Sequence, residues 1–85
     1  MTISYSKNFI KQSKKLTPRL REKIVERIER FSINPFDPPL RNHLLKGAYQ
    51  EYGSINITGD YRALYLVRDT EIIFDYIGTH AQLYE

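Results

Sequence analysis

The spacing of apolar residues changes about halfway along the chain, from a helical period to alternation. In the first half, apolar residues recur at spacings of four, four and three, at Leu20, Ile24, Ile28 and Phe31. This period is typical of an amphipathic helix with one face on a core. Thr17-Pro18 is a start signal for it, because threonine accepts from a free amide and proline is tolerated at the first helical position. Ser6 is placed to cap a shorter helix that ends near Leu16, after a short strand around Ile3 and Tyr5.

Strand patterns fill the second half. Ile55 and Ile57 alternate with polar neighbours, residues 61–67 are continuously strand-like, and residues 72–77 follow a turn at residues 68–70. Helices first and antiparallel strands afterwards predict an α+β fold, in which the two helices cover one face of the sheet.

Glycine and proline divide these elements. Residues 34–39 contain three prolines and cannot continue a helix, so we interpret them as an ordered connection inside one domain. Gly53 and Gly59 are expected to mark bends or tight turns. A chain of 85 residues is too short to bury two cores, which makes residues 1–85 a single domain.

Composition places the chain among ordinary globular proteins, with 41% hydrophobic and 27% charged residues. It has no cysteine, which removes disulfides and thiolate metal sites and fits a reducing cytoplasm. No apolar run is long enough for a signal peptide or a membrane span. We therefore expect a cytoplasmic protein with no membrane partner.

Charge is divided unevenly along the chain. Residues up to Ile33 hold nine Lys/Arg against three Asp/Glu, whereas residues from Asn34 onward hold four against seven. A basic first half would attract nucleic acid or an acidic protein. A solvated helix face explains the same charges equally well.

Few residues suit catalysis. Walker, GxGxxG, HExxH and nucleophile-elbow motifs are absent. His43 and His80 are the only histidines, and histidine exchanges protons near neutral pH, although each could equally be a structural surface residue. No third ligand has a spacing that would make a zinc site with them, so we expect no metal and no cofactor.

Residues around the two histidines supply cations, a carboxylate and aromatic rings: Lys46, Asp60, Tyr61, Arg62, Tyr76 and Tyr84. Cleavage of RNA by its own 2′-hydroxyl needs a base, an acid and a cation for the phosphorane, and aromatic faces hold unpaired bases. Each residue also has a structural reading. Asp60 after Gly59 is a natural turn pair, for example, and Tyr61 and Tyr76 could simply pack a strand.

Four runs of sequence stand out in the second half of the chain: His43-Leu44-Leu45-Lys46-Gly47, Gly53-Ser54-Ile55-Asn56-Ile57, Gly59-Asp60-Tyr61-Arg62-Ala63-Leu64-Tyr65 and Ile77-Gly78-Thr79-His80-Ala81-Gln82-Leu83-Tyr84. Together they resemble the RelE/ParE toxin superfamily, and within it the YafQ-like branch is nearest. The resemblance implies a RelE-like β-α-α-β-β-β(-β) fold, with two amino-terminal helices packed on a mainly antiparallel sheet.

The resemblance also implies a function. Such toxins cut messenger RNA in the ribosomal decoding site, which includes 16S rRNA, without a metal, and are held inactive by a cognate antitoxin. Contact with operator DNA is expected only through the antitoxin complex.

Site roles are implied residue by residue. His80 matches the proposed general acid, His43 and Asp60 match positions for proton transfer or for shaping the site, Arg62 matches a phosphate-contacting arginine, and Tyr84 matches an aromatic that holds substrate. Lys46, Asn56, Tyr61 and Tyr76 are further candidates for substrate binding.

Two positions depart from the YafQ pattern, since Asn56 stands where it has a histidine and Tyr76 where it has an arginine. Arg62 or Lys46 could replace the lost cation. Because the superfamily shares one fold and a fold does not settle activity, a ParE-like toxin that binds DNA gyrase and cuts nothing stays open as an alternative. The two departures also leave open a degenerate toxin that serves only as an antitoxin-binding module. The set of His43, Asp60, His80 and Tyr84 argues against the gyrase binder, which would not require it.

Overall fold

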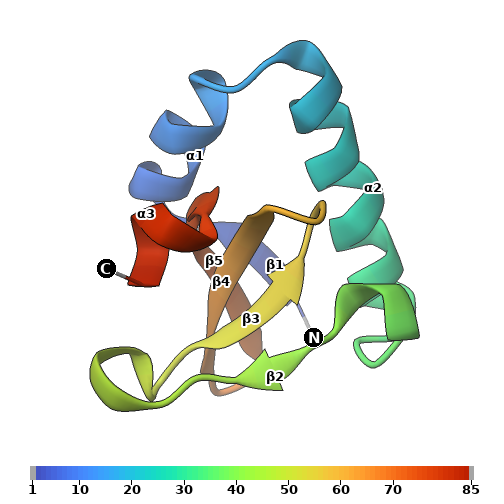
Figure 1. Ribbon diagram of the computed structural model, residues 1–85. Helices are drawn as coiled ribbons and strands as arrows, with labels where there is room; N and C mark the ends of the chain where they lie inside the picture. The colour runs from blue at the N-terminus through green and yellow to red at the C-terminus, as the bar shows by residue number, and fades with distance from the viewer. Residues whose placement is uncertain (1, 85) are drawn as a thin grey trace.

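The computed structural model describes residues 2–84, with side chains for residues 2–83. Its helices are α1 (Lys7–Lys14), α2 (Pro18–Ile33) and the short α3 (His80–Tyr84), and two 3₁₀ turns lie at Pro38–Leu40 and Gly47–Tyr49. The strands are β1 (Thr2–Tyr5), β2 (His43–Leu44), β3 (Gly53–Asn56), β4 (Tyr61–Arg68) and β5 (Glu71–Thr79). Figure 1 shows α1 and α2 arching over the sheet, with α3 beside α1.

The strands form one sheet in the order β1-β5-β4-β3-β2. Strands β2 to β5 are antiparallel neighbours, whereas β1 pairs with β5 in parallel. The chain therefore starts at one edge, crosses over through both helices, and returns strand by strand from the other edge. The expected α+β fold with a mainly antiparallel sheet is confirmed, and the parallel pair makes the sheet mixed.

Both long helices begin where the sequence predicts. The Ser6 hydroxyl accepts a hydrogen bond from the Phe9 amide (3.0 Å), and the Thr17 hydroxyl accepts one from the Leu20 amide (3.3 Å). These bonds satisfy amides that a helix start leaves without a partner. The first helix ends at Lys14, slightly before the expected position.

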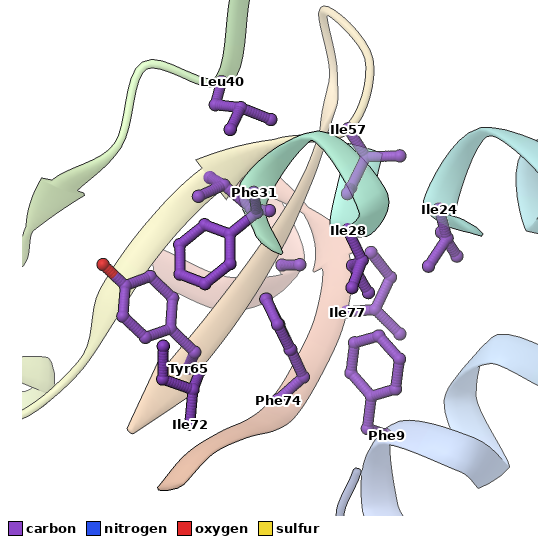
Figure 2. Packing of buried hydrophobic residues seen from close by; sticks show 12 residues of the cluster. Phe9, Ile24, Ile28, Phe31, Leu40, Ile57, Tyr65, Ile72, Phe74 and Ile77 are labelled. Carbon is purple, nitrogen blue, oxygen red and sulfur yellow. The ribbon is translucent and has the colours of Figure 1, made fainter. Parts of the chain in front are cut away.

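The core lies between the helices and the sheet (Figure 2). Phe31 of α2 meets Phe74 of β5 edge-on, with ring centroids 5.5 Å apart, and lies 5.0 Å from the ring of Tyr65 on β4. Phe9 of α1 joins the same cluster. Leu40 is fully buried in it, so the proline-rich connection is ordered, as expected.

Gly53 corrects one expectation, because it is the first residue of β3 and makes no bend. A Cβ at this position would lie 2.2 Å from the Tyr65 ring. Only glycine lets that ring cross β3, so the residue is required for close packing and not for a turn.

Helix α3 is an element that the periodicity did not predict. Its start is a reciprocal pair: the Gln82 amide donates to the Thr79 hydroxyl (3.2 Å) and the Thr79 amide donates to the Gln82 side-chain oxygen (2.9 Å). This is a capping box, and it makes His80 the first residue of the helix. Among residues 2–84, no helix has the length and apolar character needed to cross a bilayer.

Candidate active site

An open hollow of about 540 Å³ collects side chains from the β2 region, β3, β4 and α3. The residues that line it are Arg41, His43, Leu45, Lys46, Tyr49, Asn56, Arg62 and His80. Five of the nine sequence candidates therefore meet here, namely His43, Lys46, Asn56, Arg62 and His80.

The hollow concentrates positive charge. Of the four Lys/Arg residues after Asn34, it is lined by three, Arg41, Lys46 and Arg62, together with both histidines. None of the described acidic residues lines it. Because cations gathered without carboxylates attract a polyanion, this surface suits a phosphate backbone.

The backbone of Arg41 holds the His43 ring. The Nδ1 atom of His43 lies 2.8 Å from the Arg41 carbonyl oxygen. A carbonyl can only accept, so Nδ1 carries the proton, and in the neutral ring the lone pair is on Nε2. Arg41 has a left-handed backbone conformation (φ 47, ψ 46), which is rare for a residue other than glycine and is often found at functional sites.

Asn42 anchors this segment from the inside. Its side-chain oxygen accepts from the Tyr65 hydroxyl (2.6 Å), and its amide donates to the Pro35 carbonyl (3.1 Å). The Tyr65 ring reaches Asn42 by crossing Gly53, and burial raises the pKa of its hydroxyl. The two residues beside Asn42 are exposed and line the hollow.

Arg62 lies directly opposite Asn56 on neighbouring strands. Its Nη1 atom donates to the carbonyl oxygens of Thr58 (3.1 Å), Gly59 (3.1 Å) and Tyr61 (3.2 Å). The guanidinium therefore closes the turn between β3 and β4 and also borders the hollow. By contrast, the Arg41 guanidinium has no ion pair or hydrogen bond with another described side chain.

Asp60 lies outside the hollow, in the exposed turn between β3 and β4. Its carbonyl oxygen accepts from the His80 amide (3.1 Å). Through this backbone contact it holds the start of α3, and with it His80, against the turn.

Tyr61 and Tyr76 line a neighbouring hollow of about 420 Å³ instead. The Tyr76 ring belongs to a cluster with Tyr49 and Tyr52, while Tyr61 packs against the core. Tyr84 ends α3, and its side chain lies outside the described part of the structure.

Arg41, Leu45 and Tyr49 were not among the sequence candidates. For Arg41 a signal existed, since it is one of only four cations in its half of the chain and stands two residues before His43. Tyr49 had no such signal, because it sits in an irregular segment with no period. In the part of the chain that the structure describes, no group of three or more His, Cys, Asp or Glu residues could hold a metal ion.

Comparison with known proteins identifies relatives of the whole chain. Residues 1–85 match the family described as bacterial toxin of type II toxin-antitoxin system, YafQ. The crystal structure of YafQ from E. coli strain BL21(DE3) superimposes with a TM-score of 0.79 at 25% identity, covering 98% of this chain and 97% of that one. A search of curated proteins found no match.

Two further structures share the fold. A YoeB/ParE toxin from Agrobacterium tumefaciens has a TM-score of 0.77 at 22% identity and covers 94% of this chain and 99% of its own. The toxin-antitoxin complex RelBE2 from Mycobacterium tuberculosis has a TM-score of 0.76 at 22% identity, covering 93% of this chain and 96% of the matched one.

Proposed function

Because the chain belongs to the YafQ family of bacterial type II toxin-antitoxin toxins, we propose that it is an endoribonuclease that cuts messenger RNA on the ribosome without a metal ion. The observation that supports this most directly is the hollow itself. It brings together both histidines and three of the four cations of the second half of the chain, with no described carboxylate on its lining.

Each group has a role in this reaction. His43 Nε2 takes the proton of the ribose 2′-hydroxyl, whose oxygen attacks the adjacent phosphorus, and His80 protonates the leaving 5′-oxygen. The products are a 2′,3′-cyclic phosphate and a 5′-hydroxyl end. Arg41, Lys46 and Arg62 stabilise the charge of the phosphorane, and Asn56 is placed beside Arg62 to contact the ribose or phosphate.

The geometry favours His43 over Asp60 as the base. The ring of His43 is oriented by a hydrogen bond and borders the hollow, whereas the Asp60 side chain does not border it. We assign Asp60 the role of shaping the site through its contact with the His80 amide. Tyr84, on the last turn of α3, is proposed to stack on a base.

The proposal is tested by inducing expression and mapping RNA ends in growing cells. The wild-type chain should arrest growth and create new 5′-hydroxyl ends in messenger RNA. The double variant His80→Ala with Arg62→Ala should relieve both effects. Arg68→Ala is the matched control, because Arg68 is the one cation of this half that lies outside the hollow.

Other results would select one of the alternatives. Growth arrest with intact transcripts and damaged DNA would indicate a gyrase-binding toxin. Normal growth together with tight antitoxin binding would indicate a degenerate binding module.

We also propose that the chain binds a cognate antitoxin, as the toxin in the RelBE2 complex does. An apolar groove of about 490 Å³ between β1, α1 and α2 is a suitable surface, with Ile10 and Val25 exposed along it. The two helices around it carry most of the cations of the first half, which fits an acidic amphipathic partner. The same cations would attract ribosomal RNA.

Val25→Asp should weaken capture of the small acidic protein encoded next to the toxin gene. Val67→Asp is its control, since Val67 is also an exposed valine (48% against 58% for Val25) and lies outside the groove. Equal capture by both variants would place the antitoxin elsewhere.

A further inference from the structure

The loop between β2 and β3, residues 45–52, brings three side chains to the proposed active site. Leu45, Lys46 and Tyr49 all line the hollow. The structure describes all eight residues of this loop, and none of them is buried. Figure 1 shows the loop as the yellow-green segment that projects to one side of the sheet. A segment with so little buried surface opens at low free-energy cost, so its position depends on contacts that its side chains make with the rest of the fold.

Tyr52 makes such a contact. Its hydroxyl donates a 2.7 Å hydrogen bond to the Asp75 carboxylate on β5, 23 residues away. A hydrogen bond to a carboxylate is stronger than one between neutral groups. The loop also closes on itself at this residue, since the Leu45 amide donates to the Tyr52 carbonyl oxygen (2.9 Å). Tyr52 therefore connects the sheet with the start of the loop, where Lys46 stands.

Asp75 is itself fixed by the start of α1. The register of β5 against β4 shifts between Leu64 and Tyr65 and leaves Asp75 without a partner on β4, as the extra residue of a β-bulge. The carbonyl oxygen of Asp75 accepts instead from the Ser6 hydroxyl (3.2 Å) and the Asn8 side-chain amide (3.0 Å). Bulges are common next to active sites, where they redirect a side chain. Here the bulge holds a carboxylate where the loop can reach it.

We propose that Tyr52 and Asp75 are positioning residues for the RNA-cleaving site, and that their hydrogen bond holds the loop so that Lys46 reaches a substrate phosphate. Neither of the two lines the hollow, so both act through Lys46 and not on the substrate. The inference rests on the proposed function for its substrate. It goes further because it assigns a role to two residues outside the hollow.

The test measures how salt affects binding of the full chain to a 2′-O-methyl RNA hexanucleotide, which lacks the attacking hydroxyls and stays intact. Tyr52→Phe removes a hydroxyl and no charge. It should nevertheless reduce the slope of log affinity against log salt by about 0.7, the value for one phosphate contact on a single strand, because Lys46 no longer reaches the phosphate. Lys46→Gln should reduce the slope equally in the wild type and should have no further effect in Tyr52→Phe.

Arg62→Gln is the matched control for this comparison. Three carbonyl oxygens hold the Arg62 guanidinium, and none of them belongs to residues 45–52. The change should therefore reduce the slope by about 0.7 in the wild type and in Tyr52→Phe alike. General unfolding of Tyr52→Phe would instead remove the contacts of Lys46 and Arg62 together, and a thermal unfolding curve would show it.

Asp75 provides a second route to the same result. Asp75→Ala should reduce the slope as Tyr52→Phe does. The two changes together should act no more strongly than either alone, because both remove the same hydrogen bond. Asp75→Asn keeps an acceptor for the Tyr52 hydroxyl and should retain the wild-type slope.

The inference and the proposed nuclease can fail separately. A wild-type slope in Tyr52→Phe, or additive effects of Tyr52→Phe and Lys46→Gln, would overturn the inference even if the toxin cuts RNA in cells. Absence of binding by the wild type would overturn it as well, because Lys46 would then contact no phosphate. A slope that Tyr52→Phe lowers only through Lys46 would support the inference even if no cleavage is found.

Discussion

At the scale of single residues, Arg41 contributes to the hollow in two separate ways. Its carbonyl oxygen accepts from the His43 ring, and its backbone is left-handed. Its guanidinium borders the hollow without another described side chain to neutralise it. Since Arg62 is already bonded to three carbonyls, we propose that Arg41 joins Lys46 as a cation that could replace the arginine of the YafQ pattern, where this chain has Tyr76.

Arg41→Gly separates these two contributions. Glycine adopts the left-handed backbone readily, so thermal stability should be unchanged or higher, while loss of the cation should slow RNA cleavage by roughly 10²-fold. Arg41→Lys keeps a charge and should retain more activity than the glycine variant. Cleavage rates on purified ribosomes and thermal unfolding measure the two effects, and full activity of Arg41→Gly would remove the guanidinium from the mechanism.

At the scale of elements, side-chain hydrogen bonds position the two short elements that carry the histidines, β2 and α3. Strand β2 has only two residues, too few to carry a period, and its place depends on Asn42, Tyr65 and Gly53 together. Helix α3 has five residues and depends on its capping box. The sequence patterns missed α3 and led to Gly53 being predicted as a bend. Neither feature depends on the spacing of apolar residues, because α3 depends on side-chain hydrogen bonds at its start and Gly53 on the ring that packs against it.

Tyr65→Phe tests the anchor of β2. The ring and its packing stay, but Asn42 loses its donor, and leaving such a group unpaired lowers the free energy of unfolding by about 1–3 kcal/mol. Chemical denaturation should show this loss. His43 should also lose orientation, so cleavage should slow even at temperatures where the variant is fully folded; unchanged activity there would show that Asn42 does not position His43.

Thr79→Ala tests the start of α3. Removal of a capping hydroxyl should lower stability by about 1 kcal/mol, and cleavage should fall because His80 is the first residue of the helix. Thr79→Ser keeps the hydroxyl and serves as the control. If the serine and alanine variants have equal activity, the capping bond does not position His80.

At the scale of the whole molecule, the fold gathers most of the cations of the acidic second half of the chain at one place on the surface. The second half of the chain is acidic in total, yet it forms a hollow with three cations and two histidines. The resemblance to the YafQ-like branch is confirmed by the match over residues 1–85, and the expected sheet is confirmed with β1 added in parallel. The roles of individual site residues stay predictions.

Global stability should fall at alkaline pH. Burial and the hydrogen bond to Asp75 raise the pKa of Tyr52, and burial raises the pKa of Tyr65, from the ordinary value of 10.0. The stability that these two raised pKa values contribute is complete while the tyrosines of the unfolded chain are still neutral. It is lost as the pH rises from about 10 through the higher pKa values of the folded protein. Melting temperature should therefore fall above pH 10, and less steeply in Tyr52→Phe; equal slopes would contradict the shifted pKa.

The sequence by itself determined what depends on neighbours along the chain. The stripe of α2, the Ser6 and Thr17 caps and the strands β4 and β5 follow from local spacing and local hydrogen bonds, and the family follows from short runs of residues. Only the tertiary structure decided which side chains meet. The sheet and the start of α3 bring Asn56, Arg62 and His80 to the segment that holds Arg41 and His43, and place Tyr76 in the neighbouring hollow, because these contacts join segments far apart in the sequence.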